Sequence, residues 1–156
     1  MQGDAKVIDA LNELLTSELT AINQYYVHYK MCENWGFLKL AAYFREESVD
    51  EMKHADKIID RILYLDGVPN MQRYNTVLVG EDVPEQIKLM LDTEVVSANV
   101  LNALIKLSAD CGDNGTREMM ESLLVDTEQA VDWAEAQLHI IKEIGKERYL
   151  AEKLEA

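Results

Sequence analysis

One segment of the chain places metal-binding residue types inside an otherwise apolar helical stripe. In a helix, Glu51 and His54 stand three residues apart and therefore project from the same face, about one turn from each other. That face has the pattern of a buried one, because it reads Leu40, Phe44, Glu47, Glu51, His54, Ile58, Ile62 and Leu65. A buried carboxylate is costly unless another group pairs with it. The pair can share a metal ion or form an ordinary solvent-exposed couple, and the other helices must decide between the two.

The composition predicts a single helical domain, which we assign to residues 1–156. Only 2 prolines and 7 glycines interrupt long runs of helix-forming residues, and this favours an all-α fold over a sheet. The formal net charge of -14 argues against nucleic acid and against an anionic membrane surface as partners. The same charge favours the binding of cations, including metal ions.

No feature of the sequence predicts export or membrane insertion. The segment 1–6 has no apolar core of a signal peptide, and no run reaches the roughly 18 apolar residues of a spanning helix. Cys32 and Cys111 lack the spacing of a zinc site or of a disulfide framework, so we expect two reduced thiols. We therefore expect a cytoplasmic protein.

Glycine and proline positions divide the chain into four long helices and a short fifth one. We expect these helices over about residues 4–34, 37–65, 83–111, 116–144 and 146–154, with Asp4 capping the first and Thr116 the fourth. The irregular stretch 67–82, at roughly 3.3 Å per residue, could span about 50 Å, whereas a helix of about 28 residues is about 42 Å long. This stretch can therefore cross the whole bundle and place the third helix parallel to the second. The expected fold is a four-helix bundle with a long crossover between its second and third helices and a short C-terminal fifth helix.

The other helices support the metal interpretation of Glu51 and His54. Glu18 on the first helix and Glu94 on the third each interrupt an apolar stripe near mid-helix. In a bundle these positions can converge, and their oxygen and nitrogen donors suit Fe(II), Mn(II) or Zn(II). We predict a metal site formed by Glu18, Glu51, His54 and Glu94. A set of partly protonated, mutually hydrogen-bonded side chains is the alternative.

The chain resembles the bacterioferritin family over nearly its whole length. Besides the ligand positions, the resemblance rests on Leu-Thr-Ala-Ile-Asn-Gln-Tyr-Tyr at 19–26, Asn-Trp-Gly at 34–36, Asp-Glu-Met-Lys-His-Ala-Asp at 50–56, Val-Gly-Glu-Asp at 79–82 and Asp-Trp at 132–133. The resemblance implies a ferritin-like fold and a hollow cytoplasmic cage of twenty-four subunits for iron storage and iron homeostasis. It also implies Fe(II) oxidation by oxygen at a di-iron site within each subunit and haem b between two-fold related subunits.

The chain departs from the family pattern on the fourth helix. Where the family has a second Glu-x-x-His, this sequence has Thr127 and Ala130, and Glu128 lies about 100° around the helix from position 127. Position 46, often His in the family, is Glu46 here, although Asp50 remains. We therefore expect an impaired ferroxidase centre, so that enzyme activity stays an open question. A competent ferroxidase with an asymmetric centre and a purely structural haem-carrying shell are the alternatives.

Met52 points away from the metal face. By composition it would be a surface or interface methionine, but the resemblance implies that Met52 and its two-fold mate both coordinate one haem iron. The candidate walls of that haem pocket are Leu19, Ile22, Asn23, Tyr26, Val49, Lys53 and Asp56. The resemblance further implies electron transfer for iron release, with a bacterioferritin-associated ferredoxin as donor. We expect a homo-oligomer, or a hetero-oligomer with a sister subunit that keeps the complete di-iron site.

Three further residues carry weaker signals. His28 and His139 have no ligand partner three residues on, so we expect them at a surface or an interface. Tyr25 shares the face of Glu18 within about 20°. It is either a packed core tyrosine or a group that hydrogen-bonds, or is oxidised, beside the metal.

Overall fold

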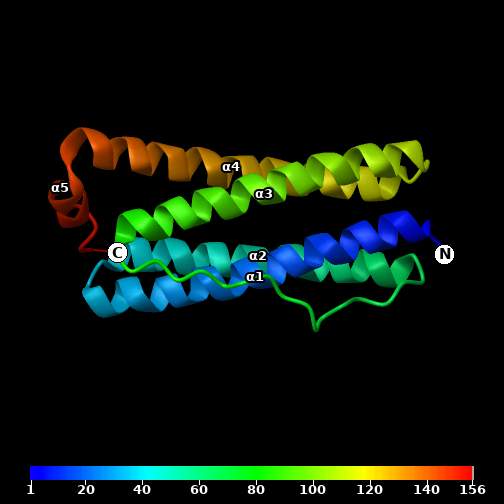
Figure 1. Cartoon of the computed structure of the whole chain (residues 1–156), viewed down its shortest axis with the longest axis horizontal. Coiled ribbons are helices and arrows are strands. Elements are labelled where there is room, and N and C mark those ends of the chain that lie inside the picture. The colour runs from blue at the N-terminus through cyan, green and yellow to red at the C-terminus, as the bar shows by residue number, and fades with distance from the viewer. Residues whose placement is uncertain (156) are drawn as a thin grey trace.

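The computed structural model describes residues 1–155, which form helices and no strand (Figure 1). The helices are α1 (Ala5–Trp35), α2 (Leu38–Tyr64), α3 (Val83–Asp110), α4 (Asn114–Ile144) and α5 (Lys146–Ala151). The four long helices lie side by side along the molecule, and α5 lies at one end. The predicted all-α, ferritin-like four-helix bundle with a short fifth helix is confirmed. Ala156, the last residue of the expected single domain, lies outside the described residues.

Local sequence signals explain where α1 begins and ends and where α4 begins. Asp4 caps α1, since its carboxylate accepts a hydrogen bond from the Lys6 backbone N–H, and Gly36 ends the helix at a positive φ of 87°. The predicted cap of the fourth helix at Thr116 is wrong. Asp113 caps α4, because its carboxylate accepts both the backbone N–H and the hydroxyl of Thr116.

The crossover between α2 and α3 runs along α1. Its backbone is bonded to four polar side chains of that helix. The anchors are Asn12 with Val68 and Asn70, Thr20 with Asn75, Gln24 with Leu78, and His28 with Gly80. Because both series of numbers rise together, the crossover runs parallel to α1 and brings the chain back to the end where α2 begins. It therefore makes α3 parallel to α2, as the length of the crossover predicted (Figure 1).

The apolar core consists of two clusters separated along the bundle. One cluster lies toward the N-terminal end of α1 and includes Leu15, Ile58 and Leu101, whereas the other includes Phe44 and Met90. Complete burial of such a side chain stabilises the fold by about 1.5–3 kcal/mol. Between the two clusters, at the middle of the long helices, the buried residues are polar. The core thus holds a polar layer between two apolar ones.

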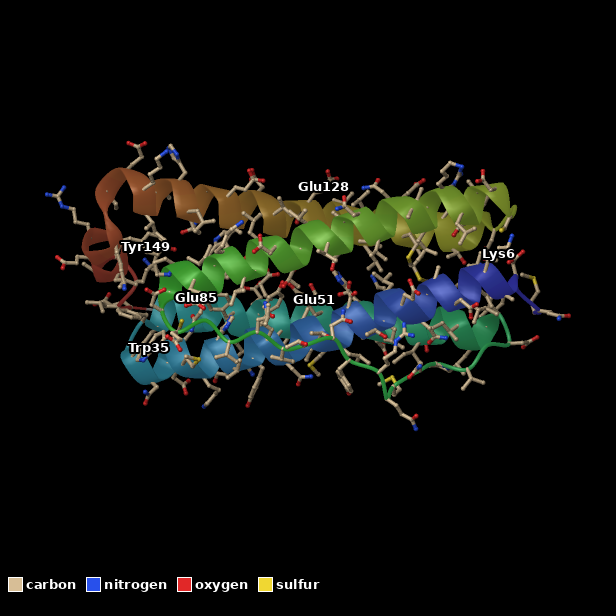
Figure 2. The ribbon with its side chains drawn as sticks, viewed as in Figure 1. Lys6, Trp35, Glu51, Glu85, Glu128 and Tyr149 are labelled. Atoms are coloured by element: carbon tan, nitrogen blue, oxygen red, sulfur yellow. The ribbon has the colours of Figure 1, made fainter. Side chains whose placement is uncertain are left out.

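The short helix α5 closes one end of the bundle. Tyr149 is buried and donates its hydroxyl hydrogen to Gln137 Oε1 of α4 at 2.7 Å. Lys146 pairs with Asp82, which caps α3, at 3.0 Å. Figure 2 shows Tyr149 and Trp35 at this same end. These contacts tie α5 to the start of α3 and to the end of α4.

Two sequence expectations concern membrane-spanning helices and the cysteines. No helix within residues 1–155 has both the length and the apolar content of a membrane span. Cys32 is buried, with its thiol 3.2 Å from Gln86 Oε1, and Cys111 is exposed. Both are free thiols in the described part of the chain.

Candidate metal centre

Three of the four predicted metal ligands meet in the polar layer. Glu18 of α1 and Glu51 and His54 of α2 each offer one ligand atom, and these atoms all lie within 4.8 Å of one another. His54 Nδ1 is 3.4 Å from Glu51 Oε2 and 3.7 Å from Glu18 Oε2. Figure 2 shows Glu51 near the middle of the bundle. The Glu-x-x-His spacing on α2 and the packing of α1 against it therefore assemble this cluster.

The fourth predicted ligand, Glu94 of α3, lies beside the cluster and not within it. Its buried carboxylate accepts a hydrogen bond of 2.6 Å from the Tyr25 hydroxyl. Burial and the nearby charge of Glu51 raise the pKa of Glu94 well above its ordinary value. Tyr25 fits both interpretations, since it is completely buried in the apolar core and its hydroxyl hydrogen-bonds beside the candidate ligands.

The donor atoms of the cluster fit a metal ion. Glu18 Oε2, Glu51 Oε2 and His54 Nδ1 are buried and have no hydrogen-bond partner. A buried polar atom without a hydrogen bond costs about 1–3 kcal/mol, and here the charge of His54, 3.4 and 3.7 Å from the two carboxylates, offsets only part of that cost. A divalent cation between them would satisfy all three. The mixture of carboxylates and imidazole suits Fe(II), Mn(II) or Zn(II).

The fourth helix presents two small side chains at this level. Thr127 and Ala130 are both buried, and the Thr127 hydroxyl donates to the Leu123 carbonyl of its own helix at 3.0 Å. Ala130 has no donor atom in its side chain. Glu128 is exposed on α4, at about the level of Glu51 along the bundle (Figure 2). It therefore lies away from the cluster, as its angular position predicted.

Asp126 is a candidate site residue that the sequence interpretation missed. Its Oδ2 lies 3.1 Å from His54 Nε2, so the carboxylate holds the side of the ring opposite to the metal-ligand cluster. Burial disfavours the charged form of His54, but the neighbouring carboxylates of Glu51 and Asp126 outweigh it and raise the His54 pKa to about 9. The Asp126 side chain is 53% exposed, so no apolar stripe marked it in the sequence.

A cavity of about 430 Å³ between α2 and α4 leads to the cluster. Its lining is Tyr43, Glu47, Asp50, Glu51, Lys53, His54, Lys57, Asp126, Thr127, Gln129, Ala130 and Trp133. The rings of Tyr43 and Trp133 stack at 3.6 Å between centroids, with an interplanar angle of 13°. Burial and the charge of Asp50 raise the pKa of Glu47 to about 7. The cavity is therefore acidic, with one aromatic wall.

The haem-pocket candidates lie on a different surface. Met52 is 53% exposed and lines a surface hollow of about 360 Å³. Four other candidates line the same hollow, namely Leu19, Ile22, Asn23 and Asp56. Tyr26, Val49 and Lys53 do not line it. Met71 and Tyr74 of the crossover do, and sequence reasoning missed them because an irregular stretch has no periodicity to read.

The prediction for His28 is wrong. His28 is completely buried, and its Nε2 accepts a hydrogen bond of 2.9 Å from the Gly80 backbone N–H. Burial lowers its pKa to about 4, so the ring is neutral. Its partner is a backbone amide on the crossover, which no side-chain spacing could reveal. His139 is exposed, as predicted.

Comparisons with known proteins agree with this arrangement. A family model described as a ferritin-like domain matches residues 8–144. The bacterioferritin of Mycobacterium bovis is 45% identical over 152 residues, which cover 97% of this chain and 96% of that protein. The bacterioferritin of Streptomyces coelicolor is 43% identical over 155 residues, which cover 99% of this chain and 93% of that protein. The bacterioferritin of Rhodobacter capsulatus is 42% identical over 149 residues, which cover 96% of this chain and 92% of that protein. From these matches over nearly its whole length, the chain belongs to the bacterioferritin family.

Proposed function

We propose that the chain is an iron-storage subunit that assembles into a cage of twenty-four copies, carries haem b and has an impaired ferroxidase centre. The proposal rests on the side chains that the fourth helix presents to the ligand cluster. At the level of the ligand cluster α4 presents Thr127, whose hydroxyl is bonded to its own helix, and Ala130, which has no donor atom. A second iron ion would therefore lack the ligands that the family pattern provides there.

One ferrous ion, as substrate, remains compatible with the cluster. Glu18, Glu51 and His54 would hold it through the three atoms that have no partner, and Glu94 lies beside Glu51 as a fourth donor. Oxygen reduction at a pair of irons needs both positions filled. A chain with one good position should therefore oxidise Fe(II) slowly. A sister subunit with the full ligand set would supply rapid oxidation within a mixed cage.

The haem part of the proposal rests on Met52. Its thioether is exposed at a hollow whose walls include Leu19, Ile22 and Ile59, and an apolar surface with a sulfur donor suits the edge of a porphyrin. Two such hollows facing each other across a two-fold axis would enclose one haem. Haem with two thioether ligands has a raised reduction potential and transfers electrons. The donor we propose is a bacterioferritin-associated ferredoxin, and the result is reduction and release of stored iron.

Stopped-flow absorbance after anaerobic Fe(II) loading and oxygen addition tests the impaired centre. We expect the homo-assembly to show no fast phase. The double variant Thr127→Glu with Ala130→His should show one, because helix spacing presents both new ligands to the cluster. The variant Thr127→Leu with Ala130→Phe fills the same space without ligands and should stay slow. A fast phase in the unaltered protein that saturates at two irons per subunit would refute the proposal.

A competent ferroxidase with an asymmetric centre is the second candidate. It is favoured by Asp126, a fourth-helix carboxylate that reaches His54, and by the acidic cavity beside it. Under this candidate the unaltered protein has a fast phase, and Asp126→Ala abolishes it. A purely structural haem-carrying shell would show neither a fast phase nor Fe(II) binding at His54. The fast phase therefore separates the second candidate from the other two functions, and an Fe(II)-binding titration of the unaltered protein and His54→Ala separates those two from each other.

A further inference from the structure

We propose that Asn12 and Thr20 of α1 are positioning residues for haem. They hold the crossover in the position where Met71 and Tyr74 form one wall of the surface hollow that contains Met52. This inference rests on the haem part of the proposed function. It adds that two polar side chains outside the hollow control how long haem stays bound.

The hollow has seven wall residues on helices and two on the crossover. The packing of the bundle fixes those on α1 and α2, whereas residues 67–80 of the crossover form no helix or strand. Met71 and Tyr74 are 45% and 50% exposed, so burial of these two side chains holds the crossover only weakly. A thioether and an aromatic ring both pack well against a flat porphyrin. The crossover therefore completes a wall that suits haem, and other contacts must keep that wall in place.

Asn12 binds the crossover next to Met71. Its Nδ2 donates to the Val68 carbonyl oxygen at 3.1 Å, and its Oδ1 accepts the Asn70 backbone N–H at 2.7 Å. The Asn70 side chain in turn accepts the Gln72 backbone N–H at 3.1 Å. The backbone on both sides of Met71 is therefore bonded, and Asn12 is the side chain that ties it to α1.

Thr20 binds the crossover next to Tyr74. Its hydroxyl oxygen accepts the Asn75 backbone N–H at 2.9 Å, and the hydroxyl donates to the Thr16 carbonyl oxygen at 2.7 Å. Thr20 is only 6% exposed, so water would replace this hydroxyl poorly. Leu19, the preceding residue, lines the hollow from α1. The same turn of α1 thus forms part of one wall and anchors another.

These anchors set the equilibrium between a docked and a detached crossover. An irregular segment gains conformational entropy when it detaches, and the hydrogen bonds to α1 oppose that gain. Haem that packs against Met71 and Tyr74 stabilises the docked state, and by linkage the docked state binds haem more tightly. Haem therefore leaves through the detached state, and its release rate follows the population of that state. Loss of one anchoring hydrogen bond should raise that population about twofold to tenfold.

The test uses the assembled, haem-loaded full-length protein and measures haem transfer to an excess of an apoglobin that captures free haem. In Thr20→Val and in Asn12→Ala the release rate should rise at least about twofold. The low-spin spectrum should stay unchanged in both variants, because Met52 is intact. Thr20→Ser keeps the hydroxyl and should restore the slow rate. Ser108→Ala is the control, because it removes a buried hydroxyl of α3 that donates to the carbonyl oxygen of Leu104 on its own helix.

Two further measurements examine whether the anchors act through the crossover wall. In a background with Met71→Ala and Tyr74→Ala, Thr20→Val should have no additional effect on haem release, because the wall that it positions is gone. An undiminished effect in that background would show that Thr20 acts by another route and would overturn the inference. Hydrogen exchange needs no substitution: haem loading should slow amide exchange in residues 68–75 at least about threefold. Equal exchange there with and without haem would also overturn it.

The outcomes separate this inference from the haem site on which it rests. If Met52→Ala keeps the low-spin spectrum, haem is bound elsewhere, and the haem part of the proposed function fails together with the inference. If Met52→Ala loses the spectrum but Thr20→Val and Asn12→Ala release haem no faster than the unaltered protein, the inference alone is overturned. The same conclusion follows if Thr20→Ser releases haem as fast as Thr20→Val, or if Ser108→Ala does so.

Discussion

Asp126 offers the sharpest perturbation of the candidate centre, because its carboxylate touches a predicted ligand without joining the ligand cluster. Replacing it by alanine removes the group 3.1 Å from His54 Nε2. A carboxylate in this position fixes the orientation and tautomer of the ring and increases the basicity of its other nitrogen. We therefore expect Asp126→Ala to weaken metal binding at His54 Nδ1.

The expected loss of metal affinity depends on how exposed the Asp126 side chain is and on the competition between metal and proton for His54. Loss of such a partner typically costs 10–100-fold in metal affinity, and the 53% exposure of the Asp126 side chain places this case near about tenfold. At neutral pH the effect should be smaller. There the metal must displace a proton from His54, whose pKa is about 9, and removing Asp126 lowers that pKa and eases the displacement. Above pH 9 the proton is absent, so the full loss should appear.

The assay is competition for Zn(II) against a chelator at pH 7 and at pH 9.5. Glu128→Ala is the matched control, because Glu128 is exposed on the same helix two residues further on. Asp126→Asn keeps an acceptor oxygen without the charge and should fall between Asp126→Ala and the unaltered protein. The reasoning fails if Asp126→Ala binds Zn(II) as tightly as the unaltered protein at pH 9.5, or if Glu128→Ala weakens binding equally.

Three other predictions test separate parts of the molecule. Met52→Ala should abolish the low-spin haem spectrum while native mass spectrometry still shows the assembled cage; an unchanged spectrum would rule out Met52 as a haem ligand. In the folded chain the pKa of His28 is about 4, below its ordinary value of 6.5, so between these values the folded chain binds fewer protons than the unfolded chain. The free energy of unfolding should therefore fall by about 3 kcal/mol as the pH decreases from 6.5 to 4. His28→Gln keeps an acceptor for Gly80 and should flatten that dependence in denaturant unfolding at pH 7 and 4.5, and an equally steep loss in the variant would contradict this assignment. Gly80→Ala should lower the melting temperature, because its Cβ would lie 2.7 Å from Gln86 Cγ and from the Gln86 backbone nitrogen; an unchanged melting temperature would show that the crossover adjusts freely.

The sequence predicted the fold and the ligand cluster because both are periodic. Glycine and proline marked the helix ends, and Glu18, Glu51 and Glu94 stood out as acids inside apolar stripes. Residues on the buried faces of adjacent helices can meet, and Glu18, Glu51 and His54 do so, whereas Glu94 lies beside them. The length of the crossover then fixed the direction of α3 by simple arithmetic.

The missed features depend on how helices rotate against each other and on backbone groups. Asp126 is half exposed, and its contact with His54 depends on the rotation of α4 against α2, which periodicity does not determine. His28 binds a backbone amide 52 residues away, so no pattern of side chains pointed to it. Two small residues of α4, Thr127 and Ala130, line the cavity. A small residue continues a buried helical stripe as well as a large one does, so the sequence pattern did not indicate a cavity there.

The distribution of the candidate ligands over the helices has a consequence for the order of folding. Glu18, Glu51 and His54 belong to α1 and α2, which pack mainly against each other, whereas Glu94 and Asp126 belong to the second pair, α3 and α4. The N-terminal hairpin is synthesised first and is held by contacts local in sequence, which form early. A nascent chain with only α1 and α2 formed would therefore already carry three of the candidate ligands on the face that α3 and α4 later cover. Docking of the second hairpin then encloses these ligands, so a metal captured early would tie the first hairpin together before the bundle closes.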